Sequence, residues 1–236
     1  MDFDFAFMFE ASLAALHYLP ITLLLGFLPL IFGSAIGLGI ALIRHYKIPI
    51  LAVFFKWFVT IFKAIPVVLI LLVSYLVFSD VFDTMADSLA LSISFSDIDR
   101  RWIAIFALTL YATSGLSEIF RGALASIPKG QTDAASSVGL TNLQVLRRVM
   151  IPQVIPLALP LVNNMLISLI KASSLVSMVS VVDILNGAVI EANVNYRYLE
   201  AYVAVSIIYW GVCASIEAVT AGYEKYAHRS RRRQFA

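Results

Sequence analysis

The chain has 236 residues, of which 61% are hydrophobic and 14% are charged, and its formal net charge is +2. Soluble globular domains carry about 25% charged residues, so this composition excludes a chain that faces water on all sides. Backbone groups in lipid must be hydrogen-bonded internally, and the apolar runs are long, so we expect an all-α membrane protein.

Five apolar runs are each long enough to cross the hydrocarbon core, which takes a helix of about 20 residues. In chain order they cover residues 19–43, 57–78, 102–123, 155–179 and 199–219. The first run contains Gly33 and Gly37, whose spacing predicts a face that a neighbouring helix approaches closely. Pro66 lies inside the second run, where we expect a kink. Residues 1–236 are therefore expected to form a single transmembrane domain.

The positions of Lys and Arg predict how the chain is oriented, because short cytoplasmic connections are enriched in them. The connections after the first and third runs, together with the tail, hold Arg44, Lys47, Lys56, Lys63, Arg121, Lys129, Arg147, Arg148, Lys225, Arg229, Arg231, Arg232 and Arg233. The opposite connections are acidic. We therefore expect an N-terminus outside the cell, a C-terminus inside, and a basic tail that could also bind anionic membrane lipid.

Residues 126–152 form the longest polar interruption between the predicted spans, and this orientation places them in the cytoplasm. A short helix is expected first, ended by Gly139. Thr141 and Gln144 have the spacing of a capping box, which predicts a second helix, and Pro152 is expected to close the segment. Such a surface helix pair suits either docking into a groove of a soluble partner or lying on lipid.

This segment carries a recognisable motif, made of Asp133-Ala134-Ala135, then Gly139, then Ile151-Pro152. The motif resembles the EAA loop of binding-protein-dependent ABC importer permeases. The flanking stretches "SEIFRGALASIPKGQTDAASSVGL", "RRVMIPQVIPLALP" and "LISLIKASSLVSMVSV" resemble those of the polar amino acid permeases, the histidine/glutamine/arginine/opine subfamily. Two positions depart from the pattern: Asp133 stands where members have Glu, and Ala172 where they usually have Asp.

The resemblance implies the type I ABC importer permease fold, with the segment 126–152 as the element that couples the membrane helices to a separate ATPase. It assigns the ATPase contact to Asp133, Ala134, Ala135, Gly139 and Leu140. ATP and Mg²⁺ would bind to a dimer of that ATPase. This chain has no Gly-Lys-Ser or Gly-Lys-Thr loop ending for phosphates, no metal-ligand cluster and no catalytic residues of its own.

The resemblance further implies the partners and the location. It points to a second permease chain, identical or paralogous, an extracellular or periplasmic binding protein, and an amino acid as substrate. The expected location is the cytoplasmic (inner) membrane of a bacterium, as a multi-pass protein, with no nucleic acid partner.

Lys171 is the strongest candidate for contact with substrate. An ionisable residue at the centre of a span costs about 2.5–3.5 kcal/mol on insertion scales, so it marks a functional candidate. Together with Ser173 and Ser174, Lys171 could bind the carboxylate of an amino acid. The alternative is an internal ion pair that fixes helix packing.

Other polar residues in the spans allow two interpretations. Glu118 could bind the ammonium group of the substrate, or it could pair with Arg121 three residues further along the same helix. Asn163 and Asn164 could line the pathway, or they could hydrogen-bond between helices.

Two other classes of protein fit the composition: a secondary transporter or channel that acts alone, and a membrane scaffold without a transport role. No internal repeat supports the first. Within the importer class, cystine, neutral or dipolar amino acids and basic amino acids all remain open as substrates. The absence of Asp at position 172 weighs against cationic ones.

Overall fold

The computed structural model describes residues 3–89 and 94–234, with side chains up to residue 222. Its α-helices are α1 (Phe5–His17), α2 (Leu19–His45), α3 (Leu51–Ala64), α4 (Val67–Ser88), α5 (Arg100–Ala125), α6 (Lys129–Ser137), α7 (Asn142–Val145), α8 (Ile151–Ala172), α9 (Ile184–Asn195) and α10 (Tyr198–Gln234). The described ranges contain no strand, and five of their helical segments are long and apolar enough to cross a membrane. The prediction of an all-α membrane protein with five spans is confirmed.

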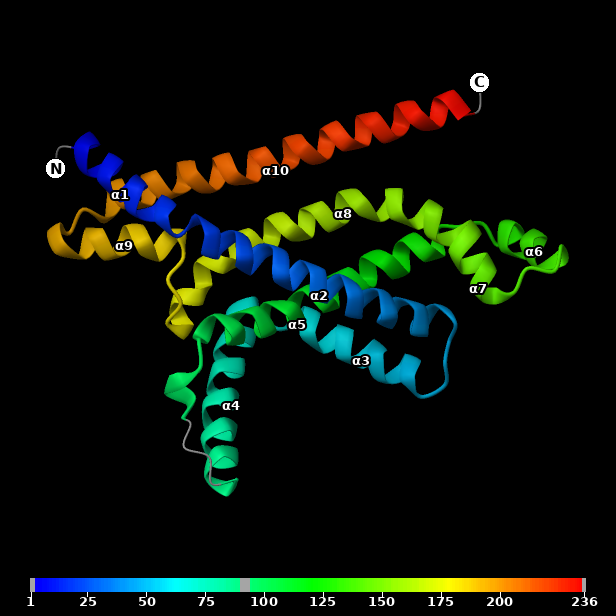
Figure 1. Ribbon diagram of the computed structural model, residues 1–236, viewed down its shortest axis with the longest axis horizontal. Coiled ribbons are helices and arrows are strands. Elements are labelled where there is room, and N and C mark those ends of the chain that lie inside the picture. Colours follow the sequence, from blue (N-terminus) through cyan, green and yellow to red (C-terminus); the bar gives the residue numbers. More distant parts are fainter. Residues whose placement is uncertain (1–2, 90–93, 235–236) are drawn as a thin grey trace.

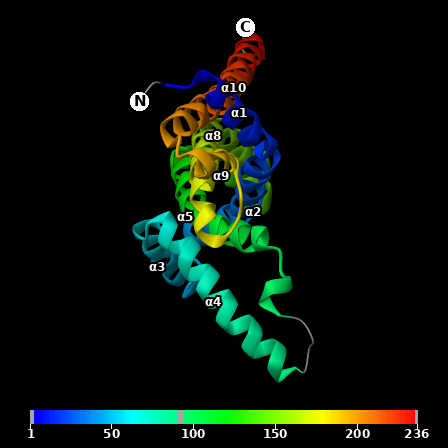
Figure 2. The same cartoon turned by 90° about the vertical axis from the view of Figure 1, so that its left-hand side faces the viewer.

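Four long helices, α2, α5, α8 and α10, run along the length of the molecule (Figure 1). The short helices α6 and α7 lie at one end of this bundle, and α1 and α9 lie at the other. α4 projects away from the bundle, as the end-on view also shows (Figure 2). Only 11% of its most apolar stretch is buried within this chain.

The close approach predicted for the first span occurs between α2 and α5. A Cβ atom added at Gly33 would lie 2.8 Å from the Cβ of Ala112, and one added at Gly37 would lie 3.0 Å from the backbone nitrogen of Ser117. Any larger side chain would push the two helices apart. The two glycines therefore allow the backbone contact that organises the centre of the bundle.

The second span is displaced from its predicted position at 57–78. α3 ends at Ala64, Ile65 is extended (φ −85°, ψ 129°), and α4 begins at Val67. A proline disfavours helical backbone in the residue before it and lacks the N–H that an uninterrupted helix needs. Pro66 thus separates two helices rather than kinking one, and the prediction of an internal kink was wrong.

Two helices at one end of the bundle, α1 and α9, were not predicted. They pack against each other and against α10 through small buried side chains: Ala11, Ala15, Ala188, Ala192, Ala201 and Ala204. Alanines at this contact let three helices pack closely. Each of the two helices is too short to span a membrane.

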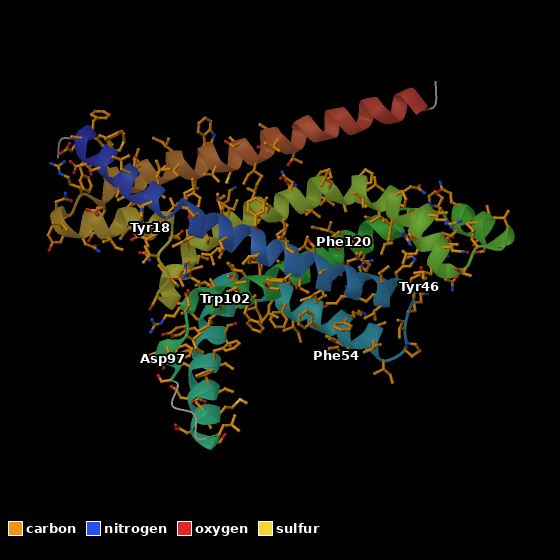
Figure 3. All side chains as sticks on the ribbon, in the orientation of Figure 1. Tyr18, Tyr46, Phe54, Asp97, Trp102 and Phe120 are labelled. Carbon is orange, nitrogen blue, oxygen red and sulfur yellow. The ribbon has the colours of Figure 1, made fainter. Side chains whose placement is uncertain are left out.

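Aromatic side chains mark both ends of α2 (Figure 3). Tyr18 lies at its N-terminal end, on the side of α1 and α9, and Tyr46 lies at its C-terminal end, on the side of α6 and α7. Tyrosine rings are enriched where a membrane helix meets water. The apolar length of α2 therefore fits a span bounded by these two rings.

Candidate functional site

α8 carries a polar stripe on its outer face. Asn164, Ser168 and Lys171 follow one another at spacings of four and three residues, and all three are exposed on this chain. Buried Leu166 and Leu169 occupy the opposite face. Polar groups are costly against lipid, so this stripe is expected to face another protein surface or a water-filled path.

A cavity of about 610 Å³ lies beside the stripe, between α8, α9 and α10. We call it the α8–α10 cavity. It is lined by Ile167, Lys171, Ser174, Leu185, Val205, Ser206, Tyr209, Trp210, Cys213, Ala214 and Glu217. Two of the residues predicted to contact substrate, Lys171 and Ser174, thus lie on its wall.

Lys171 and Glu217 are both exposed, and neither forms an ion pair with another residue whose side chain is described. The alternative in which Lys171 is held by an ion pair within the chain therefore has no support among these residues. Glu217 was missed in the sequence. The rule that selected Lys171, an ionisable residue inside a predicted span, would also have found it.

Ser173 and the two asparagines have different surroundings. Ser173 is fully buried, donates to the carbonyl oxygen of Ile170 at 2.8 Å and is not among the cavity-lining residues. Asn163 accepts a hydrogen bond of 2.8 Å from the hydroxyl of Thr220, which links α8 to α10. Asn164 lies on the exposed stripe. The structure thus places Asn163 in a helix–helix contact and only Asn164 on the open face.

Glu118 lies between two arginines. One carboxylate oxygen accepts from Arg44 of α2, and the other accepts from Nη2 of Arg121 at 2.7 Å. The side chains of Arg44 and Glu118 are 15% and 23% exposed, against 42% for Arg121. We call these three residues the Glu118 cluster. Both oxygens of the carboxylate are engaged, which favours the structural interpretation of Glu118 over contact with a substrate ammonium group.

A fully buried carboxylate, that of Asp183, lies toward the other end of the molecule. Asp183 is fully buried, caps the N-terminus of α9 by accepting from the backbone N–H of Asn186, and accepts from the hydroxyl of Tyr209 at 2.6 Å. Burial raises the pKa of Asp183 above its ordinary value, and these hydrogen bonds partly oppose that shift. Tyr209 also lines the α8–α10 cavity, so this bond fixes part of the cavity wall.

The segment 126–152 contains the two predicted helices. α6 is followed by Gly139 at φ +86°, a left-handed conformation that glycine adopts without steric cost. Thr141 and Gln144 form both hydrogen bonds of the capping box that begins α7. The helix, glycine turn and second helix are therefore confirmed.

Pro152 does not close the segment. α7 runs through a π-helical turn, Leu146–Met150, into α8, so one helical stretch extends from Asn142 to Val179. Pro152 has no N–H to donate, but it directly follows this π-helical turn, where the backbone hydrogen-bond pattern already changes, and the helical stretch continues past it. The segment 126–152 is thus joined directly to the helix that carries Lys171.

The residues predicted to contact the ATPase differ in exposure. Asp133, Ala134 and Gly139 are exposed, and Leu140 is partly buried. Ala135 is 8% exposed and packs in the same apolar cluster as Val145 and Met150. Ala135 therefore holds α6 against α7 and the π-helical turn, which leaves Asp133 and Ala134 free for a partner.

In the described ranges no three His, Cys, Asp or Glu side chains lie together as a metal site. The expectation that this chain binds no metal or nucleotide stays a prediction.

Comparisons with known proteins agree on one family. A family model described as "Binding-protein-dependent transport system inner membrane component" matches residues 33–225. The chain is 32% identical over 219 residues to PatM of Vibrio harveyi, a probable amino-acid ABC transporter permease protein, and the match covers 93% of this chain and 94% of that one. It is 35% identical over 207 residues to YxeN of Bacillus subtilis (strain 168), a probable amino-acid permease protein, with 88% of each covered. A crystal structure of an amino acid ABC transporter with histidines has a TM-score of 0.80 and 26% sequence identity, over 96% of this chain and 100% of that chain.

Proposed function

The chain belongs to the family of binding-protein-dependent transport system inner membrane components, and on that premise we propose that it forms half of a path for an amino acid. The resemblance drawn from the segment 126–152 and its flanks is confirmed, as is the permease fold. The chain is a multi-pass membrane subunit of an ABC importer rather than an enzyme, a solitary transporter or a scaffold.

One observation carries the assignment to amino acids: an intramembrane lysine lines a cavity and has no ion-pair partner among the described side chains. A free ammonium group in such a place suits a carboxylate that arrives from outside the chain. The hydroxyl of Ser174 already donates to the carbonyl oxygen of Lys171 at 2.7 Å. The carboxylate would therefore depend chiefly on Lys171. The names of PatM and YxeN, both given as amino-acid permeases, agree with this substrate class.

The coupling role of the segment 126–152 is part of the same proposal. α6 would dock on an ATPase subunit through Asp133 and Ala134, which are exposed, beside the exposed side chain of Val138. A displacement of α6 would pass through the π-helical turn into α8 and so reach Lys171. The helical stretch from Asn142 to Val179 is continuous, and this continuity supports the proposed coupling.

The remaining partners and the orientation follow from the proposal. α6 and α7 would lie in the cytoplasm, at the basic ends of the spans, and α1 and α9 would lie outside, at the opposite end of the bundle (Figure 1). A binding protein would deliver the amino acid on that outer side. α4 buries little of its surface within this chain and would pack against a second permease chain and membrane lipid. The location would be a bacterial cytoplasmic membrane.

Two linked measurements test the substrate proposal. The tagged chain, expressed with the ATPase and the binding protein from its source, should co-purify with the ATPase. The reconstituted complex should then accumulate at least one radiolabelled amino acid from a panel, and only with ATP. Co-purification without uptake of any amino acid would refute the substrate class while leaving the family unchanged.

A pair of variants tests the coupling proposal. Ala134→Arg places a bulky cation on the proposed docking face, and Ser136→Arg places the same cation two residues along, on the side of α6 away from Ala134 and Val138, where the side chain is also exposed. We expect Ala134→Arg to insert normally and to lose substrate-stimulated ATP hydrolysis, while Ser136→Arg keeps it. Equal activity in both variants would contradict docking through that face.

A further inference from the structure

We propose that the α8–α10 cavity selects zwitterionic amino acids with an uncharged side chain, with Lys171 on the carboxylate and Glu217 on the ammonium group. This inference rests on the proposed function, because it takes an amino acid as the substrate. It assigns the ammonium contact to Glu217 in place of Glu118, whose carboxylate oxygens are both engaged by arginines.

The charge pattern of the cavity points to a zwitterion. Among the lining residues in the described part of the chain, Lys171 and Glu217 alone are charged, and they have opposite signs. Both are exposed, and neither forms an ion pair with another side chain in the described part of the chain. Two open charges inside a membrane protein are costly. A ligand that carries one charge of each sign would satisfy both at once.

The levels of Lys171 and Glu217 along their helices are close enough for one small molecule to reach both side chains. The hydrogen bond between Asn163 and Thr220 brings these two residues to the same level on α8 and α10. The helices run in opposite directions, so Lys171 lies eight residues toward the outer end from that level and Glu217 lies three. At 1.5 Å per residue, the five-residue difference places the two Cα atoms about 7.5 Å apart in level. This leaves room for an ammonium and a carboxylate on neighbouring atoms, each with one hydrogen bond of about 3 Å.

The rest of the cavity would contact the side chain of the amino acid. Its outer part is lined by Leu185, Val205, Trp210 and Tyr209. The hydroxyl of Tyr209 already donates a hydrogen bond to Asp183. No further carboxylate lines the cavity within the described residues that could pair with a cationic side chain. A charged side chain would lose its hydration there without gaining a partner, so an uncharged one is favoured.

The residue at position 172 does not decide this preference. Ala172 is 8% exposed and lies in the apolar core with Leu169 and Val176, and it is not among the lining residues of the cavity. The absence of Asp at this position therefore does not bear on the cavity. The preference for an uncharged side chain rests on the wall of the cavity itself.

Cys213 offers a direct readout of what occupies the cavity. It is the single cysteine of the chain, it lies on the cavity wall, and it is partly exposed. Its alkylation by a small maleimide can be followed by mass spectrometry in the intact permease–ATPase complex, without the binding protein. The measured quantity is the concentration of each protein amino acid other than cysteine that halves the alkylation rate.

In the wild-type complex we expect uncharged amino acids to protect Cys213, and arginine, lysine, glutamate and aspartate to protect it much less. The methyl ester of a protecting amino acid lacks the carboxylate, and its N-acetyl derivative lacks the ammonium group, so neither should protect.

Lys171→Met and Glu217→Gln should each raise the half-protecting concentration about 10- to 100-fold, the usual effect of losing a hydrogen bond to a charged group. Each variant should also lose discrimination in its own way: Lys171→Met should no longer distinguish the ester from the free amino acid, and Glu217→Gln should no longer distinguish the N-acetyl derivative.

The matched controls are Lys56→Met on α3 and Glu191→Gln on α9, which remove exposed charges outside the cavity and should leave protection unchanged. Equal protection in wild type and in both cavity variants would overturn the proposal, while uptake by the reconstituted complex would keep the proposed function. Equal protection by arginine and by uncharged amino acids would overturn the side-chain preference. A lack of protection by every amino acid, in a complex that imports one, would place the binding site elsewhere, and a complex that imports none would refute the proposed function itself.

Discussion

Charged side chains inside the spans of this chain are arranged in two different ways. In the Glu118 cluster, one carboxylate is held by Arg44 of a neighbouring helix and by Arg121 of its own. Lys171 and Glu217 both line the α8–α10 cavity, and neither has an ion-pair partner among the described side chains. Charges satisfied within the chain can hold helices together, whereas open charges cost stability unless a ligand or another chain meets them. We therefore expect the Glu118 cluster to hold helices together and the two charges of the α8–α10 cavity to act in transport.

Breaking the Glu118 cluster should have the largest effect on stability. Arg44→Gln leaves a carboxylate that is mostly buried with one exposed partner, and we expect a loss of about 3 kcal/mol, because removing one member of a buried pair leaves an uncompensated charge. Thermal unfolding of the purified permease in detergent measures this loss. Adding Glu118→Gln to the same chain removes that charge and should restore most of the stability. An Arg44→Gln variant as stable as wild type would show that the cluster does not hold α2 to α5.

Tyr209→Phe tests an intermediate case, a buried carboxylate satisfied by neutral donors. The variant removes the hydroxyl that donates to Asp183, and we expect a loss of about 1–2 kcal/mol at neutral pH. The pKa of Asp183 is already raised by burial, and losing a donor to its ionised form raises that pKa further. The stability difference from wild type should have its full size above the raised folded-state pKa of Asp183 in the variant. It should shrink as the pH falls from that pKa to the lower one of wild type, because a protonated carboxyl depends less on that donor.

A matched control for this prediction is Tyr198→Phe, which removes an exposed hydrogen bond to Asn193. Its effect on thermal unfolding should be small and independent of pH. If Tyr209→Phe showed the same flat profile, the bond between Tyr209 and Asp183 would not support the cavity wall.

Arg121→Gln should have the smallest effect of the three. Its side chain is 42% exposed, so water and salt screen its bond to Glu118, and Arg44 continues to hold the carboxylate. We expect a loss below about 1 kcal/mol, smaller still at high salt. A loss as large as that of Arg44→Gln would mean that burial does not distinguish the two arginines.

Much of the fold could be predicted from the sequence, because apolar runs of about 20 residues require membrane helices. The first span starts at Leu19 as predicted, and the fourth ends at Val179 as predicted. The second was misplaced because the run 57–78 continues across Pro66, and apolar length alone cannot show that two helices meet there. α1 and α9 were missed because helices shorter than a span depend on tertiary packing, here through alanines of α10.

The candidate site was predicted only in part. Lys171 could be found because an isolated charge in an apolar run is easy to detect. Gly139 and Thr141 could be found because their hydrogen bonds are to neighbours in the sequence. The sequence could not show that Arg44 pairs with Glu118, since Arg44 lies 74 residues away and meets it only in the folded bundle. The position of Glu217 opposite α8 likewise depends on how α10 packs. The packing of helices that are distant in the sequence therefore decides which charged side chains lack an ion-pair partner.

The most direct test of the comparison is the amount of radiolabelled amino acid taken up per inserted permease molecule, in Lys171→Met and Glu118→Gln side by side. Lys171→Met should insert at wild-type abundance, keep the bound ATPase and an unfolding temperature no lower than that of wild type, and lose uptake. Glu118→Gln should lower abundance and unfolding temperature while each inserted molecule keeps its uptake. The reverse pattern, with normal uptake in Lys171→Met and a stable but inactive Glu118→Gln, would contradict the account.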